Sequence, residues 1–368
     1  MRYFPILFLS LMVFVHLYLL ICLRRTFKPG AWLWIGYGII ALGFTLSYFR
    51  GWVRFFAPSP VFSHILYMWM GFLIILCLFL AARDALALFL HLFSRSWHAP
   101  SLRIAFLCGI LGFVYASHEA KAIRIRTVTL PTARLPDNVE TLRIVMLSDL
   151  HIQPFTPISV IDNVVRLAND QHPDILAVVG DFVDGQYADD SPQVEALSKM
   201  DGAFGKFAVL GNHERYSGYE ASKAFIQASG FTLLQGDIAE AGGIAIAGVD
   251  DPIFPGRTGI PETLAKIPDA DTFVLLLSHR PEAPEEAIGL FDLELSGHTH
   301  GGQIWPARYV MPYLNNGFTQ GANRLDAPEE RPRDRSVVYV SNGTRYWGPP
   351  VRFLTPPEIT VITLIKEQ

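Results

Sequence analysis

Five short polar sequences, each directly after an apolar run, constrain the fold of this chain most strongly. In order they are Ser148-Asp149-Leu150-His151, Gly180-Asp181-Phe182-Val183-Asp184, Gly211-Asn212-His213-Glu214, Ser278-His279 and Gly297-His298-Thr299-His300. The runs before them, 142–147, 175–179, 207–210, 273–277 and 293–295, have the length and composition of buried β-strands. Loops that follow the strands of an α/β sheet are where catalytic groups gather. We therefore expect the five polar sequences to lie close together.

The segments between these runs predict the fold class. Helical patterns occur at 158–169, 192–200, 218–228 and 281–288. Strands that alternate with helices pair mostly in parallel. Three later runs, 244–249, 337–340 and 359–364, are strand-like with shorter connections, and the charged stretch 324–335 predicts a solvated hairpin or loop. We expect an α/β fold in which a sandwich of sheets is flanked by helices.

The N-terminal third of the chain has a different composition. The whole chain is 51% hydrophobic and 17% charged, with a mean hydropathy of +0.29, which is too apolar for one soluble domain. Four stretches before Lys121 approach the ~20 residues that a membrane-spanning helix needs: 4–23, 31–49, 61–82 and 102–117. The sequence predicts about four transmembrane helices in 1–120, a linker at 121–140 and one catalytic domain at 141–368.

Two alternatives for the apolar stretches are weaker. Buried core helices would not alternate so regularly with loops that contain Arg. A cleaved signal peptide would end at small residues, whereas the first apolar run leads into Arg24-Arg25. We expect a multi-pass protein of a bacterial cytoplasmic membrane.

The orientation in the membrane depends on Lys and Arg near the expected spans. Six lie on the side of the catalytic domain (Arg2, Arg50, Arg54, Lys121, Arg124, Arg126) and six on the other (Arg24, Arg25, Lys28, Arg83, Arg95, Arg103). Because Arg83 adjoins Asp84, discounting it gives the first side the larger positive charge. The sequence then predicts that the catalytic domain faces the cytoplasm.

Charge and cysteine content exclude two kinds of site. The net charge is −4, and the catalytic part has no long basic patch of the kind that a nucleic-acid groove requires. The three cysteines, Cys22, Cys77 and Cys108, all fall in the apolar stretches. The catalytic part therefore has neither a disulfide framework nor a thiolate metal site.

The polar sequences supply oxygen and nitrogen ligands for metal ions. The candidates are Asp149, His151, Asp181, Asn212, His279, His298 and His300. Carboxylate, amide and imidazole donors without sulfur suit Mn²⁺, Fe or Zn²⁺. Seven groups are too many for one ion, and if Asp181 bridges they divide into two sets of four. Each short sequence alone is more often a turn or a helix cap, but an ordinary domain has no reason to place all five at strand ends.

The pattern D-x-H, G-D-x-x-D, G-N-H-[DE], a separate His and G-H-x-H resembles the calcineurin-like metallophosphoesterase superfamily, from 142 to the C-terminus. Two further stretches, 297–303 and 348–352, resemble its branch of YkuE-like enzymes and transmembrane proteins with a metallophosphoesterase domain. The resemblance implies a β-sandwich flanked by helices and metal-dependent hydrolysis of phosphoric esters. It implies two divalent ions, with Mn²⁺ preferred over Fe or Zn²⁺.

The resemblance also implies roles for individual residues. Asp149, His151, Asp181 and His300 would hold the first metal ion, and Asp181, Asn212, His279 and His298 the second. His213 would assist the leaving group, with Glu214 or Asp184 orienting it. Gln303, Asn342 and Arg352 are the expected substrate contacts, and Tyr346 and Trp347 lie in the same loops.

The expected activity is hydrolysis of a phosphomonoester, phosphodiester or pyrophosphate bond by metal-activated water. Membrane spans favour a phosphorylated substrate that is linked to a lipid, and the resemblance suggests UDP-2,3-diacylglucosamine of lipid A synthesis. The alternative is a non-catalytic membrane receptor or envelope-binding protein that uses the same fold. The sequence leaves the oligomeric state open.

Overall fold

The computed structural model describes residues 4–27, 30, 34–38, 41, 60–93, 98–185, 191–269 and 271–367. The chain divides into two compact units. A helical unit comprises Met1–His118 together with Gly348–Val351, and a catalytic unit comprises Glu119–Trp347 together with Arg352–Gln368.

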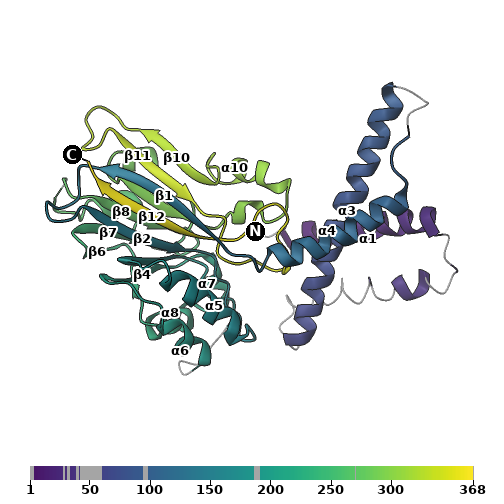
Figure 1. Ribbon diagram of the computed structural model, residues 1–368, viewed down its shortest axis with the longest axis horizontal. Helices are drawn as coiled ribbons and strands as arrows, with labels where there is room; N and C mark the ends of the chain where they lie inside the picture. Colours follow the sequence, from purple (N-terminus) through teal and green to yellow (C-terminus); the bar gives the residue numbers. More distant parts are fainter. Residues whose placement is uncertain are drawn as a thin grey trace. The chain divides into compact units, whose positions relative to one another are not determined.

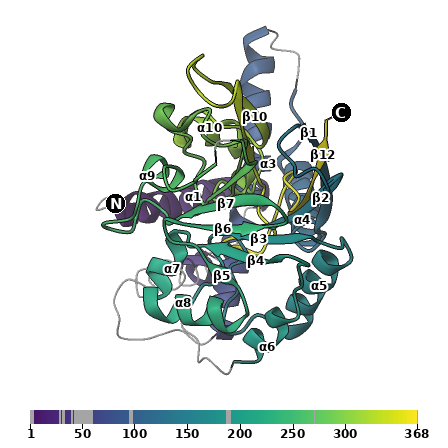
Figure 2. The ribbon, with the colours of Figure 1, turned by 90° about the vertical axis from the view of Figure 1, so that its left-hand side faces the viewer.

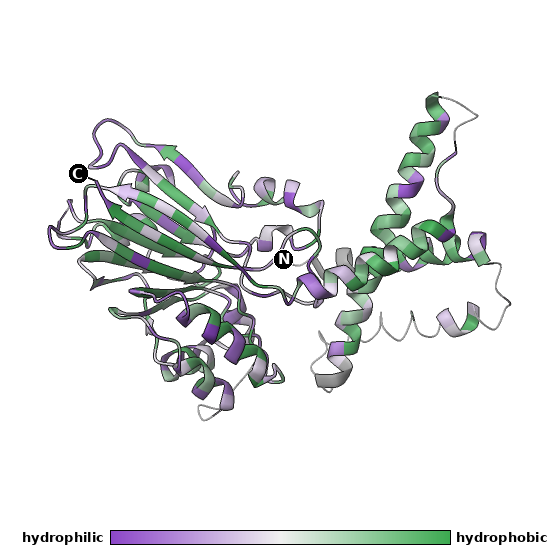
Figure 3. Ribbon diagram, viewed as in Figure 1, coloured by the Kyte–Doolittle hydropathy of each residue, from purple (hydrophilic) through white to green (hydrophobic). Residues whose placement is uncertain are grey.

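Within its described residues, the helical unit contains three long helices, α1 (Phe4–Phe27), α3 (Pro60–Phe93) and α4 (Leu102–Glu119). Figure 3 shows that α3 and α4 are predominantly hydrophobic. The three helices share a buried apolar cluster that contains Leu19 of α1, Leu73 and Leu76 of α3, and Phe106 of α4. Such packing of apolar helices is typical of a helical bundle.

Two of the four expected spans correspond to helices that are long and apolar enough to cross a membrane. They are Ser63–Phe93 and Leu102–Glu119, with mean hydropathies of 2.5 and 1.2. The first expected span lies on α1, and most of the second, 31–49, falls outside the described residues. The described part of the chain thus shows two candidate spans and does not establish a bundle of four.

The catalytic unit is built on two six-stranded sheets (Figure 1). The first sheet has the order β1 (Arg124–Thr132), β12 (Glu358–Lys366), β2 (Thr141–Leu147), β3 (Ile175–Val179), β4 (Gly205–Val209) and β5 (Thr232–Leu233). The second has the order β10 (Gly321–Asp326), β11 (Arg335–Val340), β9 (Leu293–Ser296), β8 (Val274–Ser278), β7 (Ile244–Val249) and β6 (Asp237–Ala241). The expected α/β sandwich is therefore confirmed.

Parallel pairing dominates the centre of each sheet. Strands β2, β3, β4 and β5 run in parallel, as do β7, β8, β9 and β11. Parallel strands end at the same edge of a sheet, so the loops that follow β2, β3 and β4 meet there, and so do the loops after β8 and β9. This topology brings the five polar sequences together.

Alternation along the strands builds two layers of the core. In β2, Ile144 and Met146 face the second sheet, where Leu275 and Leu295 belong to the same buried cluster. The neighbouring residues of β2, Val145 and Leu147, contact the other side, which is covered by helices. Those helices are α5 (Ile158–Asn169), α6 (Pro192–Ser198) and α8 (Tyr219–Ala228), and Figure 2 shows them together beside the first sheet.

The remaining helical elements are short. They are α7 (Asn212–Ser217), α9 (Ile260–Leu264), α10 (Met311–Leu314) and the 3-10 turns η1 (Glu285–Ala287), η2 (His300–Gly302) and η3 (Ala307–Tyr309). The helix expected at 281–288 is only the turn η1, because Pro281 and Pro284 remove backbone donors and disfavour a helix before them. Residues 121–140, predicted to be a linker, contain strand β1, which pairs in parallel with β12.

Candidate metal centre

The loops after five strands bring the polar sequences to one place. Asp149 and His151 follow β2, Asp181 follows β3, and Asn212 and His213 begin α7 after β4. From the second sheet, His279 follows β8, and His298 and His300 follow β9. Short contacts between these residues across the two sheets show that both sheets contribute to a single centre: His279 pairs with Asp181, and the backbone N–H of His298 donates to Asp149.

Several of these residues have an unusual backbone conformation. A positive φ is found at Asp149 (54°), His151 (42°), Asp181 (50°), His298 (66°) and His300 (50°). A side chain in this region of φ/ψ space carries strain of about 1–3 kcal/mol, and such residues cluster at functional sites. The surrounding fold holds five side chains in strained positions that direct them toward one another.

The glycines before two of the ligand positions leave room for close approach. A Cβ atom at Gly211 would overlap the carboxylate and backbone nitrogen of Asp181. A Cβ atom at Gly297 would lie 2.5 Å from Oδ2 of Asp149. The Gly in these motifs is required because a neighbouring carboxylate packs directly against the backbone.

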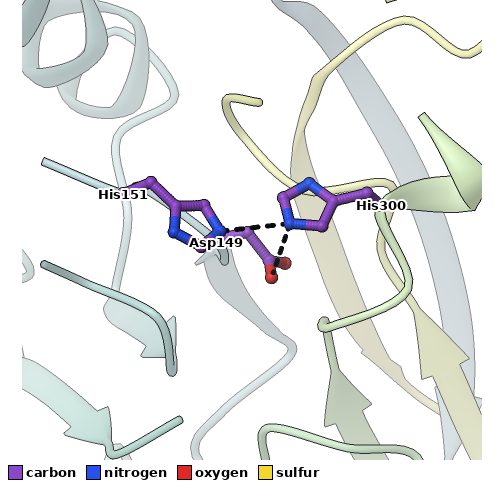
Figure 4. Close-up of side chains that lie close together, drawn as sticks. All are labelled: Asp149, His151 and His300. Carbon is purple, nitrogen blue, oxygen red and sulfur yellow. Dashed lines mark hydrogen bonds and ion pairs between the residues drawn. The ribbon is translucent and has the colours of Figure 1, made fainter. Parts of the chain in front are cut away.

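The first group of donor atoms belongs to Asp149, His151 and His300 (Figure 4). Nε2 of His300 lies 3.1 Å from Nε2 of His151 and 3.4 Å from Oδ1 of Asp149. Metal–nitrogen bonds of about 2.1 Å place neighbouring ligand atoms about 3.0 to 3.4 Å apart. The three donors therefore have the spacing of ligands around one ion.

The second group belongs to Asp181, His279 and His298. Nε2 of His279 lies 3.2 Å from Oδ2 of Asp181 and 3.2 Å from Nδ1 of His298. The side chain of His279 is fully buried, and that of Asp181 is 3% exposed. This group has the same ligand spacing as the first.

Asp181 connects the two groups. Its Oδ2 atom is 3.2 Å from Nε2 of His279 in the second group and 3.7 Å from Nε2 of His151 in the first. One carboxylate between two sets of imidazoles is the arrangement that holds two cations ~3.5 to 4 Å apart. The donor set therefore fits two divalent ions that share Asp181.

Electrostatics in the centre also favour cations. Burial alone lowers the pKa of His279, but the carboxylates of Asp181 and Asp149 outweigh it and raise that pKa to about 10. Burial, together with the positive charges of His279 and Arg280, lowers the pKa of His298 to about 2. The carboxylates thus draw a proton onto His279, at a place where a metal ion would coordinate instead.

Oxygen atoms lie close to Nδ1 of two imidazoles, on the side of each ring that faces away from the donor groups. Nδ1 of His279 lies 3.0 Å from the carbonyl oxygen of Val179. Nδ1 of His151 lies 3.2 Å from Oδ2 of Asp184. When the Nδ1–H of His279 donates to this carbonyl oxygen, Nε2 of that ring is left free to bind a metal ion, and the carboxylate of Asp184 favours the same orientation of the His151 ring through its charge.

His213 lies beside the donor groups and pairs with Asp184. Its Nδ1 atom is 2.5 Å from Oδ1 of Asp184, and its Nε2 atom is 3.9 Å from Oδ2 of Asp181. Burial alone lowers the pKa of His213, but these two carboxylates outweigh it and raise the pKa to about 9. These carboxylates favour the protonated form of His213, and its Nε2 atom faces Asp181.

Glu214 has a different environment from the one expected. Its buried carboxylate accepts hydrogen bonds from the backbone N–H groups of Gly211 (2.6 Å), Asp181 (3.1 Å) and Val183 (3.0 Å). It thereby joins the loop after β3 to the loop after β4. The residue that orients His213 is Asp184, whereas Glu214 positions the backbone that carries Asp181 and Asn212.

Asn212 is the first residue of α7 and is 6% exposed. Its Oδ1 atom is 3.4 Å from Nη2 of Arg280, the residue after His279. The neighbouring N–H of His213 donates to Oδ1 of Asp181 at 2.9 Å. Asn212 is thus next to the second group, and its role as a ligand stays a prediction.

The three expected substrate contacts lie in different environments. Gln303 donates to the carbonyl oxygen of Trp347 and accepts from its N–H, each at 2.9 Å. The ring of Trp347 packs edge-on against His213, with 5.8 Å between centroids. Asn342 is 2% exposed and donates to Glu358. Only Gln303 of the three lies toward the open side, where it positions Trp347.

Arg352, the third of these residues, is completely buried. Its guanidinium donates to the carbonyl oxygens of His300 (2.7 Å) and Arg345, and its Nη2 atom is 3.1 Å from Nδ1 of His300. These contacts lie behind the metal-binding face of the His300 ring. They support a role in positioning a metal ligand.

Two residues at the centre were not identified from the sequence. Arg280 pairs through Nε with Oδ2 of Asp251 at 2.6 Å, and its side chain is 34% exposed. Tyr216 is 58% exposed, and its ring packs edge-on against His213 with 5.4 Å between centroids. The sequence could have indicated both residues. Arg280 directly follows the candidate ligand His279, and Tyr216 is three residues after His213 on α7, so the two side chains lie on the same face of that helix.

Comparison with known proteins agrees with this geometry. The family model for calcineurin-like phosphoesterases matches residues 142–302. An uncharacterized metallophosphoesterase of Aquifex aeolicus is 35% identical over 264 residues, which are 70% of this chain and 98% of that protein. The uncharacterized metallophosphoesterase YkuE of Bacillus subtilis is 30% identical over 267 residues, covering 69% and 90% of the two chains.

One similar protein is named as a transmembrane protein. The transmembrane protein with metallophosphoesterase domain from Danio rerio is 30% identical over 280 residues, which are 72% of this chain but only 62% of that protein. Among solved structures, the NAD nucleotidase of Haemophilus influenzae aligns with a TM-score of 0.40 at 15% identity, covering 55% of this chain and 45% of that one. The sequence matches confirm the family resemblance. The chain belongs to the calcineurin-like phosphoesterase family, a family of metal-dependent phosphoric ester hydrolases.

Proposed function

We propose that the chain is a membrane-anchored hydrolase in which two divalent ions promote attack of water on a phosphate ester or pyrophosphate. Mn²⁺ is the preferred ion, with Fe or Zn²⁺ as alternatives. The position of Asp181 between the two histidine groups is the observation that carries this proposal. When bound, the two ions would neutralise phosphate oxygens and lower the pKa of a water molecule. The first ion would be held by Asp149, His151, Asp181 and His300, and the second by Asp181, Asn212, His279 and His298.

His213 supplies the proton in this proposal. Asp184 accepts from Nδ1 of His213 and fixes the orientation of the ring. Because the pKa of His213 is raised to about 9, its Nε2 carries a proton that can pass to the leaving-group oxygen. A receptor without turnover, the alternative function, has no need for a protonated, oriented histidine at this position.

Arg280 adds an anion-binding group at the edge of the centre. The buried carboxylate of Asp251 holds its Nε, while Nη2 lies 3.4 Å from Oδ1 of Asn212. The planar guanidinium presents further N–H donors, which suit phosphate oxygens. We assign Arg280 to binding the phosphoryl group of the substrate.

Anchoring favours a substrate at the membrane. The two apolar helices α3 and α4 precede the catalytic unit, and the similar protein of Danio rerio is named as a transmembrane protein. An anchor holds the catalytic unit close to substrates that are themselves confined to the membrane. A phosphorylated lipid-linked substrate is therefore proposed, with UDP-2,3-diacylglucosamine as the narrowest candidate and a cytoplasmic-facing domain as the orientation that it requires.

Substrate profiling of the purified full-length protein tests the proposal. Hydrolysis of p-nitrophenyl phosphate, bis-p-nitrophenyl phosphate and UDP-2,3-diacylglucosamine would be compared in the presence of Mn²⁺. Turnover of at least one substrate is expected, with a loss of about 10³-fold in Asp181→Asn. Asp162→Asn, an exposed carboxylate on α5, is the matched control. Equal rates for wild type and Asp181→Asn would refute the enzyme proposal.

A further inference from the structure

We propose that an exposed aromatic and aliphatic surface next to the metal centre inserts into the interfacial region of a lipid bilayer. This surface, called here the interfacial patch, consists of Trp305, Tyr309, Val310, Tyr313, Leu314 and Leu354. The inference rests on the proposed membrane anchoring and adds to it a second contact between the catalytic unit and the bilayer.

The exposure of the interfacial patch is large for side chains of this kind. Tyr313 is 89% exposed, Leu314 is 69% exposed and Tyr309 is 64% exposed. The short helix α10 and the turn η3 contain no buried residue. Exposed apolar side chains gathered on two neighbouring segments are characteristic of an interaction site. Trp and Tyr with aliphatic neighbours are the side chains found at the headgroup level of a membrane.

Backbone hydrogen bonds hold this segment in a defined conformation. The N–H of Trp305 donates to the carbonyl oxygen of Phe353 at 2.9 Å, next to a bridge between Ile304 and Phe353. The N–H of Gly317 donates to the carbonyl oxygen of Pro312 at 2.8 Å. The polar backbone is thus paired internally, and the apolar side chains project from an ordered segment.

The charge of the segment suits an anionic membrane surface. Arg308 is the single charged residue between Gly301 and Asn323, so no carboxylate opposes approach to lipid phosphates. The guanidinium of Arg308 lies 5.9 Å from the centre of the Tyr309 ring. One basic and several amphipathic aromatic side chains favour a bilayer over a protein partner, whose interface would call for paired charges at the rim.

The interfacial patch is connected to the end of a candidate membrane span. Glu119, the last residue of α4, accepts a hydrogen bond from the N–H of Thr355 at 3.4 Å. The hydroxyl of Thr355 donates to the carbonyl oxygen of Gln303 at 2.5 Å, two residues before Trp305. Glu119 belongs to the same compact unit as the patch, so the patch starts two hydrogen bonds from the residue at which the chain leaves the candidate span.

The same connection leads to the metal centre. Gln303 follows η2, which contains the ligand His300, and its side chain binds the backbone of Trp347. Trp347 in turn contacts His213. A bilayer in contact with the interfacial patch would therefore bring phosphorylated headgroups near the catalytic histidine.

Fluorescence from a label on the interfacial patch tests the contact directly. A nitrobenzoxadiazole label would be attached to Tyr313→Cys in full-length protein whose native cysteines, Cys22, Cys77 and Cys108, are replaced by alanine. The protein would be placed in nanodiscs of phosphatidylcholine and phosphatidylglycerol. The matched control is Phe204→Cys, an aromatic residue that is 53% exposed at the amino end of β4, opposite the metal centre.

The proposal predicts a blue-shifted emission for the label at 313 and quenching by a nitroxide carried on a shallow lipid position. The label at 204 should be quenched by aqueous iodide and not by the lipid nitroxide. Equal access of iodide to both labels would overturn the proposal.

An activity comparison gives the second readout. Trp305→Ser, Tyr309→Ser and Tyr313→Ser would be combined in one variant, with Phe204→Ser as the control. Hydrolysis of soluble bis-p-nitrophenyl phosphate should be unchanged, while hydrolysis of hexadecyl p-nitrophenyl phosphate in vesicles should fall about tenfold. Equal rates of wild type and triple variant on the vesicle substrate would count against the interfacial patch.

The two experiments separate this inference from the proposed function. If wild type hydrolyses neither ester, the proposed function fails, whereas the label at 313 still reports whether the interfacial patch enters the bilayer. If both esters are hydrolysed and the label remains in water, the interfacial contact fails and the phosphoesterase function stands.

Discussion

His213 and Asp184 form the shortest contact between a histidine and a carboxylate at this centre, with 2.5 Å between Nδ1 and Oδ1. The other carboxylate oxygen of Asp184 lies 3.2 Å from Nδ1 of His151, a proposed metal ligand. One side chain therefore orients both a proton donor and a ligand. Under the proposed function, this arrangement would couple proton transfer to the geometry of the first metal site.

Removing the proton donor should affect poor leaving groups most. We expect His213→Asn to lower kcat about 10²–10³-fold for a phenyl phosphodiester, and much less for the p-nitrophenyl analogue, whose leaving oxygen needs no proton. Steady-state rates across substituted phenyl esters measure this difference. Asp184→Asn should give the same trend and weaken metal binding as well. A loss that is equal for all leaving groups would show that His213 does not supply the proton.

Arg280 should control affinity for the phosphoryl group. Arg280→Ala is expected to raise KM about tenfold and to weaken competitive inhibition by inorganic phosphate to a similar extent, because one charge-assisted contact is lost. Arg166→Ala, which removes an exposed arginine of α5, serves as the matched control. Unchanged KM and unchanged phosphate inhibition would exclude the assigned role.

Arg352 should be required for metal binding at the first site. Arg352→Lys removes hydrogen bonds to the carbonyl oxygens of His300 and Arg345. We expect a loss of about 3 kcal/mol in the free energy of unfolding and a selective loss of metal from the site of His300.

The control for this prediction is another buried arginine. Arg333 is 4% exposed and pairs with Asp292, away from the metal centre. Arg333→Lys should also destabilise the protein but retain its metal content. Metal analysis and thermal unfolding of both variants distinguish the two effects. Equal metal content in the two variants would contradict the positioning role of Arg352.

Stability should depend on pH through Glu294 of β9. This carboxyl is fully buried and accepts from the hydroxyl of Ser296 at 2.8 Å, and burial raises its pKa from 4.5 to about 7. The neutral form is therefore favoured in the folded state, so this group's contribution to stability is lost as pH rises from 4.5 through about 7.

The substitution Glu294→Gln removes this dependence. The gain in melting temperature of the variant over wild type should be larger at pH ~8 than at pH ~5. Only wild type must bury a charge at the higher pH. Glu240→Gln, at an exposed position of β6, should show no such difference. The same offset for Glu294→Gln at both pH values would rule out this explanation.

The central strands, and the polar sequences at their ends, could be predicted because both depend on local sequence. Runs such as 175–179 are apolar at every position, which fits a parallel strand buried on both faces. The glycines and polar residues that follow mark turns in which side chains pack against the backbone, as the close approach of Gly211 to Asp181 shows. The local pattern was therefore enough to predict that the five polar sequences lie close together.

Other features depend on contacts between distant parts of the chain. Strand β1 alternates exposed and partly buried residues without a strong apolar run, and it forms only because β12 pairs with it. The loop sequence around Arg352 resembles an exposed turn, yet the carbonyl groups of His300 and Arg345 enclose its guanidinium. Similarly, Glu214 adjoins His213 in sequence but bonds to backbone groups of another loop. A local sequence pattern does not indicate these hydrogen-bond and strand partners, because they are distant in the sequence.

Metal content of the full-length protein, measured by inductively coupled plasma mass spectrometry after saturation with Mn²⁺, tests the central claim most directly. The shared position of Asp181 predicts about two equivalents for wild type and for Asp162→Asn, and no more than about one for Asp181→Asn. One equivalent or none in wild type, or two equivalents retained by Asp181→Asn, would contradict a dimetal centre joined by this aspartate.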